Sequence, residues 1–329
     1  VDPADPIDMV FNIAEGTIPS RSREALVPAV CQSLSIPCTG SDPSTLGVAL
    51  DKSWTKRIVS ASGVAVPCEI VLSPGDPIPD VDSLAQQGLL SFPMLVKPAW
   101  EGSSKGIRTR SLVRNHHELE EAILACQSHY GQPAMVEEFI AGDEVTVGLL
   151  GPGEPWIGVM RILPQKPTEA FVYSLEVKRN WQEMVRYEAP AQFSEKTLNR
   201  IKYLARKVWD QLGLRDISRI DFRVRQGEPV FLEVNPLPGL DPVLLTGTDA
   251  PGHAVLHEDD GVGGDRGADP EGQRGVGHVD GFQQHPAGCD GAHRRDAVVQ
   301  SHGGQRLGRL DFGFFVHADV KHGGCGHVV

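Results

Sequence analysis

The stretch RIDFRVRQGEPVFLEVN, residues 219–235, most limits what this chain can fold into, because its side chains alternate in two runs. Apolar residues occupy every second position of each run: Ile220, Phe222 and Val224 in the first, and Val230, Leu232 and Val234 in the second. A period of two is typical of β-strands whose two faces meet different surroundings. Residues 226–228 supply a turn between the runs, so the stretch predicts an antiparallel hairpin.

Two carboxylates and an amide lie on the polar face of this hairpin. If the loop has three residues, Arg225 pairs with Pro229 and Asp221 then faces Glu233, whereas a two-residue loop would break this alignment. Facing carboxylates about 5 Å apart repel each other, and a cation between them removes the repulsion. Together with Asn235, they offer the oxygen ligands that Mg²⁺ prefers. The alternative interpretation is a polar sheet face in contact with solvent.

The size and charge of the chain narrow the class of protein. Its 329 residues are enough for two or three domains with a sizeable core. The formal net charge of −12 argues against nucleic acid or an anionic membrane as a partner. No apolar run approaches the roughly 20 residues of a membrane span, and the first residues lack the basic and apolar regions of a secretory signal. We therefore expect a cytoplasmic enzyme or binding protein.

Helical and extended patterns alternate along residues 1–245, which favours an α/β or α+β architecture. Apolar spacing and end signals predict helices at residues 20–36, 51–64, 115–131 and 194–214. Strands are predicted at residues 8–13, 68–72, 92–99, 133–140, 144–150, 155–163 and 170–178. Beyond about residue 245 the chain is rich in glycine and histidine, and we expect this part to be poorly ordered.

A strand that delivers Lys97 is followed by a loop of small residues in VKPAWEGSSKGI, residues 96–107. Gly102, Ser103, Ser104 and Gly106 let backbone N–H groups approach a phosphate closely, and the two hydroxyls add donors. The spacing is neither that of a Walker A loop nor that of GxGxxG. The stretch is a candidate phosphate-binding loop, with an ordinary hairpin loop as the alternative.

The stretch MVEEFIAGDEVTV, residues 135–147, places carboxylates beside apolar side chains where one predicted strand gives way to the next. Glu137 and Glu138 precede Phe139 and Ile140, and Glu144 follows. Carboxylates and backbone groups can bind adenine and ribose while apolar side chains cover the ring. The stretch predicts a nucleotide-binding hinge, with an ordinary domain hinge as the alternative.

Five motifs, taken in order, resemble the ATP-grasp superfamily, and most of all the D-alanine–D-alanine ligases and their close relatives. The motifs are SIPCTGSDPSTLGVALDKSWTK (residues 35–56), VKPAWEGSSKG (96–106), VEEFIAGDEVTVG (136–148), SRIDFRV (218–224) and FLEVNPLPG (231–239). The resemblance implies an α+β fold in which two α/β lobes, residues 51–137 and 138–245, clasp ATP. A partial parallel α/β lobe at residues 1–50 is expected before them, as if the family's first strand and loop were truncated, and an atypical tail at residues 246–329 after them.

The same resemblance implies roles for the nucleotide-binding residues. Lys52 and Lys97 would bind the α- and β-phosphates, and Lys178 would reach the γ-phosphate. The adenine-binding hinge would be formed by Glu137, Glu138, Phe139 and Ile140, with Glu144 on the ribose. The loop that closes over ATP would contain Glu101, Gly102, Ser103, Ser104 and Gly106, with Ser103 and Ser104 near the γ-phosphate.

The resemblance also implies the catalytic centre and the activity. Asp221, Glu233 and Asn235 would hold two Mg²⁺ ions, with Mn²⁺ as a substitute, and Arg219 would steady the reacting acyl group, next to Gly239 in the substrate site. Arg219, Ser103 and Lys178 are the implied catalytic residues.

Such ligases activate a carboxylate as an acyl phosphate, which an amine then attacks. D-alanine is the expected substrate, peptidoglycan precursor synthesis the expected process, and a homodimer an expected assembly. The alternatives are a ligase for another amino acid or amine, and an inactive ATP-binding remnant.

Overall fold

The computed structural model describes residues 7–16, 20–102, 104–166, 168 and 170–239. The described residues divide into two compact units, one that contains residues 7–11 and 31–39 and one that contains residues 12–30 and 40–239 with the gaps just given. In the described part of the first unit, Val10 forms a parallel bridge with Cys38. The strand predicted at residues 8–13 is therefore wrong beyond this bridge, because hydrogen bonds to residues 37 and 39 hold its backbone at Val10 alone. The predicted tail, residues 246–329, lies outside the described residues.

The α-helices of the described residues are α1 (Leu26–Ser33), α2 (Pro43–Leu50), α3 (Lys52–Ala61), α4 (Val81–Gln86), α5 (His116–Tyr130), α6 (Leu175–Arg179), α7 (Trp181–Met184) and α8 (Glu195–Leu212). The strands are β1 (Glu69–Leu72), β2 (Met94–Pro98), β3 (Leu112–Val113), β4 (Ala134–Glu138), β5 (Asp143–Leu150), β6 (Trp156–Pro164), β7 (Val185–Glu188), β8 (Ile217–Arg225) and β9 (Glu228–Asn235). Short 3-10 helices cover Arg23–Ala25 and Thr109–Ser111.

The helices begin where side chains cap their first N–H groups. Asp51 accepts the N–H of Trp54 at the start of α3, and Ser194 accepts that of Thr197 at the start of α8. The four predicted helices are confirmed as α1, α3, α5 and α8. Helix α2 was not predicted, although Asp42 caps it in the same way, ahead of a proline at its first position.

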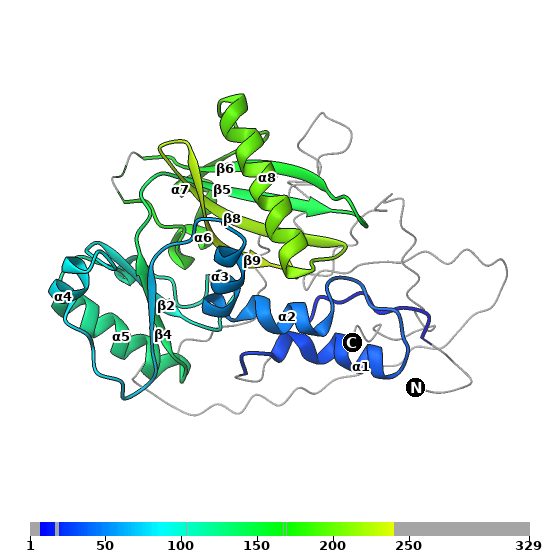
Figure 1. Cartoon of the computed structure of the whole chain (residues 1–329), viewed down its shortest axis with the longest axis horizontal. Helices are drawn as coiled ribbons and strands as arrows, with labels where there is room; N and C mark the ends of the chain where they lie inside the picture. Colours follow the sequence, from blue (N-terminus) through cyan, green and yellow to red (C-terminus); the bar gives the residue numbers. More distant parts are fainter. Residues whose placement is uncertain (1–6, 17–19, 103, 167, 169, 240–329) are drawn as a thin grey trace, which may run out of the picture. The chain divides into compact units, whose positions relative to one another are not determined.

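The first sheet is antiparallel and has the strand order β1-β4-β2-β3. Helix α5 packs on β2 and β4 (Figure 1). Leu119 and Ile123 of α5 are buried against Met94, Val96 and Val136 of the sheet. The opposite face of β2 and β4 carries Lys97 and Glu137 together with Leu95 and Met135, and three of these four residues line the candidate site.

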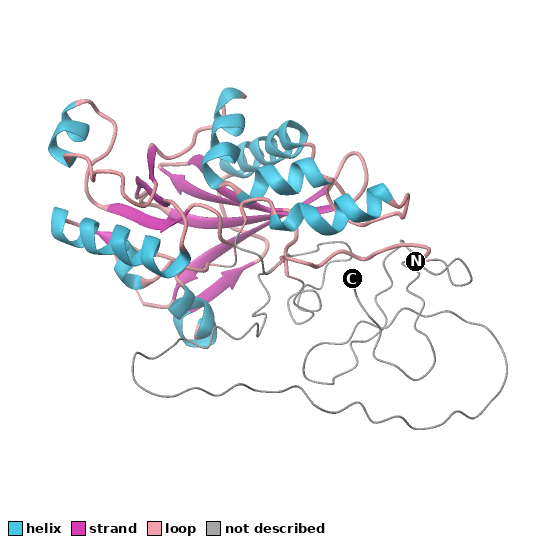
Figure 2. Ribbon diagram, turned by 90° about the horizontal axis from the view of Figure 1, so that it is seen from below, coloured by secondary structure: helices cyan, strands magenta, loops and turns pink. Residues whose placement is uncertain are grey.

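The second sheet is also antiparallel and has the order β7-β6-β5-β8-β9. Figure 2 shows the strands and the helices around them in separate colours, and in Figure 1 α8 lies across this sheet. Val147 of β5 and Phe222 of β8 are fully buried in the core that the sheet shares with α8. Because side chains alternate along a strand, Thr146 and Asp221 point to the other face.

The hairpin of β8 and β9 reaches the predicted register by a different route. Its loop has two residues, because Arg225 pairs with Glu228 rather than with Pro229. A β-bulge then leaves Leu232 without a partner opposite, and Asp221 faces Glu233 as predicted. The loop length and the simple alternation predicted for the second run are therefore wrong, while the facing carboxylates are confirmed.

The strand predicted at residues 170–178 is wrong, because this segment ends in the short helix α6. Ser174 caps the helix by accepting the N–H of Val177, which competes with any extended pairing. Among the described residues, we find no helix with the length and apolar character needed to cross a membrane.

Candidate functional site

A cleft in the second unit brings together many of the residues predicted to bind a nucleotide or a metal. Its walls come from β2 and β4 of the first sheet, from β5, β6, β8 and β9 of the second, and from the segment before α6. The predicted residues that line it are Lys97, Ser104, Glu137, Glu138, Phe139, Ile140, Glu144, Arg219, Asp221 and Glu233. Segments far apart in the sequence therefore meet at one place.

Part of the cleft wall is apolar and suits a flat ring. Besides the predicted hinge residues, it contains Leu95, Met160, Ile162, Val172 and Leu232. None of these five was predicted as a site residue. A signal was present for Met160 and Ile162, because β6 carries buried apolar residues on both of its faces and so must be covered on both.

Lysines and carboxylates meet at the end of the cleft next to the first sheet. Lys97 Nζ of β2 lies 2.6 Å from Glu137 Oε1 of β4. The second oxygen of Glu137 accepts a hydrogen bond from Lys56 of α3, and Lys56 Nζ also lies 2.9 Å from Glu69 Oε2 of β1. Lys56 was not predicted to take part in the site. Its spacing of four residues from Lys52 puts both lysines on one face of α3 and was the available signal.

Burial and the neighbouring charges shift the pKa values of this buried cluster. Burial by itself raises the pKa of Glu137, but Lys56 and Lys97 outweigh it and lower the pKa to about 2. Burial likewise lowers the pKa of Lys56, yet Glu137 and Glu69 outweigh it and raise that pKa above its ordinary value. For Lys97, burial and the charge of Lys56 together outweigh Glu137, so its pKa falls below the ordinary value.

The two facing carboxylates of the hairpin lie on the opposite wall. Asp221 and Glu233 both line the cleft, and cations compensate their charges. Arg219 donates to Asp221 Oδ2 through Nη2 at 2.9 Å, and Lys52 Nζ lies 3.4 Å from Glu233 Oε2. Thr146 Oγ1 donates to Asp221 Oδ1 at 2.7 Å. Two carboxylates on one wall form a donor set that fits Mg²⁺ or Mn²⁺.

Arg223 is a cleft residue that was not predicted. It pairs across the strands with Glu144, and its Nη2 lies 2.7 Å from Glu144 Oε2. Its guanidinium carbon lies 5.5 Å from the centre of the Phe139 ring. Arg223 thereby contacts one predicted hinge residue, Phe139, and the predicted ribose-binding residue, Glu144. The alternation of residues 219, 221 and 223 on one strand face was the signal.

The predicted loop residues are only partly in the cleft. Ser104 lines it, Gly102 and Gly106 flank Ser104 in the chain, and Ser103 lies outside the described residues. Glu101 does not line the cleft: its carboxylate lies 3.1 Å from Arg23 Nη2. The carbonyl oxygen of Glu101 accepts a hydrogen bond from Lys52.

Four further predicted residues also lie outside the cleft lining, and the first is Lys52 of α3, which reaches the cleft residue Glu233. Lys178 is buried in α6, the helix that follows the cleft residue Tyr173. Asn235 ends β9, and its Oδ1 accepts the N–H of Leu237 at 3.1 Å. Gly239 is half-buried beyond β9. The structure therefore brings Asp221 and Glu233 together in the cleft and leaves Asn235 at its border.

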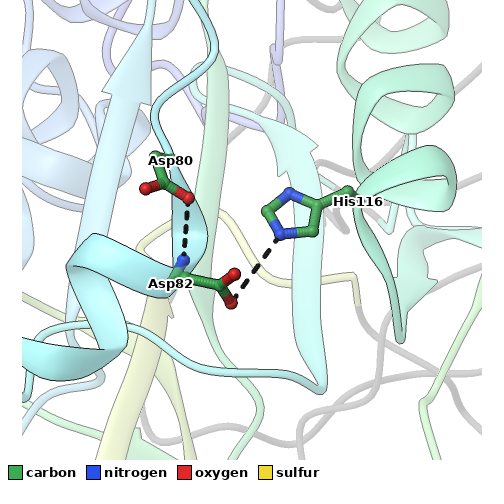
Figure 3. Close-up of side chains that lie close together, drawn as sticks. All are labelled: Asp80, Asp82 and His116. Atoms are coloured by element: carbon green, nitrogen blue, oxygen red, sulfur yellow. Dashed lines mark hydrogen bonds and ion pairs between the residues drawn. The ribbon is translucent and has the colours of Figure 1, made fainter.

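Asp80, Asp82 and His116 form a separate cluster that is not part of the cleft lining (Figure 3). Their possible ligand atoms lie within 4.8 Å of one another, but all three side chains are exposed. Asp80 Oδ1 accepts the N–H of Asp82 at 3.1 Å, and His116 Nε2 lies 3.9 Å from Asp82 Oδ1. Exposed carboxylates with such local contacts are common without an ion, so we assign this cluster no function.

Glu24, next to Arg23, predicts a pH dependence of stability. Burial raises the pKa of Glu24 from 4.5 to about 7. The folded state thus holds this proton more tightly than the unfolded state, so the contribution of Glu24 to stability is fully present below pH 4.5 and is lost as the pH rises to about 7. At about 1.4 kcal/mol per pKa unit, the loss is on the order of 3 kcal/mol. We expect Glu24→Gln to melt at a higher temperature than the unchanged protein at pH 8 and at a similar temperature at pH 4.5. A variant that stabilises equally at both pH values would contradict the assignment.

Two antiparallel sheets that line one cleft with lysines, carboxylates and an apolar wall define a nucleotide-binding protein of the ATP-grasp class. Solved structures agree. The fold matches a D-alanine–D-alanine ligase from Bacillus anthracis complexed with ATP, with a TM-score of 0.55 and 23% identity over 71% of this chain and 69% of that chain. It also matches the D-Ala:D-Ser ligase VanG from Enterococcus faecalis, with a TM-score of 0.56 and 27% identity over 70% of this chain and 64% of that one.

Sequence comparison narrows the class to a family. A family model described as "D-ala D-ala ligase C-terminus" matches residues 59–246. The D-alanine–D-alanine ligase of Aquifex aeolicus is 36% identical over 240 residues, which cover 72% of this chain and 75% of that protein. An uncharacterized protein of Sinorhizobium fredii is 32% identical over 72% of this chain and 69% of its own length. The chain belongs to the D-alanine–D-alanine ligase family, and this family uses ATP.

Proposed function

We propose that this chain is a Mg²⁺-dependent ligase that joins two D-alanine molecules at the expense of ATP. The observation that carries the proposal is the placement of Asp221 opposite Glu233 in the same cleft as Lys97 and Arg219. Carboxylates suited to a divalent cation and basic side chains suited to phosphates then face one ligand position. Membership of the D-alanine–D-alanine ligase family supports this substrate.

The reaction has two steps that these residues can support. The carboxylate of the first D-alanine attacks the γ-phosphorus of ATP, forming an acyl phosphate and releasing ADP. The amine of the second D-alanine then attacks the acyl carbon, and phosphate leaves as the peptide bond forms. Asp221, Glu233 and Asn235 would hold Mg²⁺, which would neutralise charge on the phosphates when bound.

The protein side chains have the remaining tasks in this proposal. The hinge at residues 137–140 binds the adenine, and Glu144, held by Arg223, binds the ribose. Lys52 and Lys97 neutralise the α- and β-phosphates, and Lys178 the γ-phosphate. These positive charges are placed before the reaction, so they need little rearrangement as negative charge moves in the transition state.

Arg219 and the loop at residues 101–106 act on the reacting group in this proposal. Arg219 is 4% exposed and lies beside Asp221, where its charge would stabilise the oxyanion of the tetrahedral intermediate. Gly239 would contact the substrate. The loop, with Ser103 and Ser104, would close over the phosphates and keep water from hydrolysing the acyl phosphate.

We also propose that the two ATP-binding lobes are residues 51–137 and 138–245, after an α/β lobe at residues 1–50. The first sheet falls in one range, apart from the last residue of β4, and the second sheet in the other. Because the reaction consumes ATP, we place it in the cytoplasm.

Product formation from a panel of substrates tests the function. We expect ADP, phosphate and a dipeptide from D-alanine with ATP and Mg²⁺, and no dipeptide from L-alanine. Chelation of divalent cations should abolish the reaction, and Mg²⁺ or Mn²⁺ should restore it. The similarity to a D-Ala:D-Ser ligase makes D-serine the second amine to test. ATP binding without turnover of any amine would indicate an inactive ATP-binding remnant. The absence of ATP binding would refute both the ligase and the remnant.

A further inference from the structure

Lys56 is a buried lysine that contacts the site only through other residues. It lies on α3, one turn after Lys52, and is 1% exposed. Its Nζ donates to Glu69 at 2.9 Å, to Glu137 and to the Met135 sulfur at 3.5 Å. An ammonium group has three N–H donors, so all of them are used within the protein. Lys56 therefore has no donor left for a ligand.

Lys97 differs from Lys56 although the two lysines share Glu137. Lys97 lines the cleft, and in the described part of the chain its ion-pair partner is Glu137 at 2.6 Å. Two of its three donors are therefore not engaged by described residues. Its pKa is lowered by burial and by the nearby charge of Lys56, whereas the pKa of Lys56 is raised. Of the two lysines, Lys97 is the less completely neutralised.

We propose that Lys56 is a positioning residue. It binds one carboxylate oxygen of Glu137, so that Lys97 pairs with the other oxygen only and its charge stays available to the phosphates of ATP. This inference rests on the proposed binding of ATP in the cleft. The cluster contains two lysines and two carboxylates and is neutral as a whole. Within this cluster, Glu69 forms an ion pair with Lys56, whereas Glu137 forms ion pairs with both lysines. Without Lys56, Glu137 would pair with Lys97 through both oxygens and compete with the phosphates for its charge.

A purely structural role for Lys56 is the competing explanation, and a double variant separates the two. Lys56→Met alone leaves Glu69 and Glu137 with one lysine between them, which would destabilise the fold by burying an excess charge. Lys56→Met combined with Glu69→Gln restores neutrality and places an apolar side chain beside Met135. The stability of this double variant should return toward that of the unchanged protein. Both oxygens of Glu137 would then pair with Lys97. A structural role predicts recovery of ATP binding, whereas the proposed role predicts that binding stays weak.

Glu69→Gln alone is the matched control. It removes the same carboxylate but leaves Lys56 in place, so Glu137 remains shared and Lys97 is at least as free as before. Its dissociation constant for ATP should be equal to that of the unchanged protein or smaller. Both variants therefore carry the same change at residue 69 and differ only at residue 56.

Calorimetric titration of the full chain with ATP and Mg²⁺, without amino acid, is the experiment. We expect a dissociation constant on the order of ten-fold larger for the double variant than for Glu69→Gln, with similar melting temperatures. Equal affinities would overturn the role of Lys56 while leaving the proposed function intact. If the unchanged protein does not bind ATP, the proposed function and this inference both fail.

Discussion

Replacing Glu233 by glutamine is expected to lower the rate of dipeptide formation by at least about 100-fold while the protein stays folded. The substitution keeps the shape of the side chain but removes one of the two facing negative charges on the cleft wall. A neutral amide is a weaker ligand for Mg²⁺, so the negative charge that develops on the phosphates loses its compensation. Glu233 is also only partly buried, at 23% side-chain exposure, so the fold should tolerate the change.

Asp221 is the less informative target of the pair. Arg219 is 4% exposed and donates to both oxygens of Asp221. Asp221→Asn would remove the carboxylate that accepts three hydrogen bonds from Arg219, and breaking a buried ion pair in this way typically costs about 3–5 kcal/mol. Loss of activity could then reflect loss of the fold. Glu233 has Lys52 as a partner at 3.4 Å, which is a weaker interaction to lose.

Glu188→Gln is the matched control for Glu233→Gln. Glu188 lies on β7 of the same sheet, has 16% side-chain exposure and is 3.7 Å from Arg161, but it does not line the cleft. Its replacement should leave the rate within about two-fold and the melting temperature nearly unchanged. Binding of Mn²⁺, followed by electron paramagnetic resonance, should weaken for Glu233→Gln alone. Full activity of Glu233→Gln would remove Glu233 from the proposed metal site.

The facing carboxylates were predictable from the sequence because face alternation is a local property of strands. Asp221 and Glu233 could be paired by counting residues, yet the count used a three-residue loop that the structure replaces with a two-residue loop and a bulge at Leu232. The shorter loop shifts the pairing by one residue and the bulge shifts it back, so Asp221 still faces Glu233. The position of the bulge depends on how Phe231 packs into the core beside Phe222. The alternation of apolar and polar residues along the sequence does not show this packing.

Contacts between distant segments account for most of what the sequence did not predict. The spacing of Lys56 from Lys52 showed only that both lysines share one face of a helix, and β1 and β4 together supply the two carboxylates that Lys56 contacts. The segment before α6 contains Phe171, Val172 and Tyr173, residue types that favour strands. Its helical end depends on a single capping serine, Ser174. Local patterns thus predicted the strands that carry the site, while the ion pairs that tune it required the three-dimensional structure.

Replacing Gly142 by alanine is expected to destabilise the protein by about 3 kcal/mol or more, through a direct clash at the junction of the two sheets. Gly142 has a φ angle of 139°, and a Cβ there would lie 2.2 Å from the carbonyl oxygen of Val224. Because this neighbour is backbone, it cannot rotate away. The displaced chain would disturb the first pairs of β5 with β8, among them Glu144 with Arg223. We therefore expect weaker ATP binding as well as a lower melting temperature.

Gly151→Ala separates the clash from the cost of the unusual backbone angle. Gly151 follows the other end of β5 and has a similarly positive φ of 119°, but the nearest atom to a Cβ there is a carbon of the Trp156 side chain at 3.6 Å. It should show the strain of a positive φ without displacing a neighbouring strand, and it lies away from the lining of the cleft. Thermal melting and ATP titration of both variants test this difference. If the two variants lose equal stability and keep equal affinity for ATP, the close approach of Gly142 to Val224 does not position Glu144. If Gly142→Ala alone loses both, the junction of β4 and β5 links the fold of the second sheet to the binding of the nucleotide.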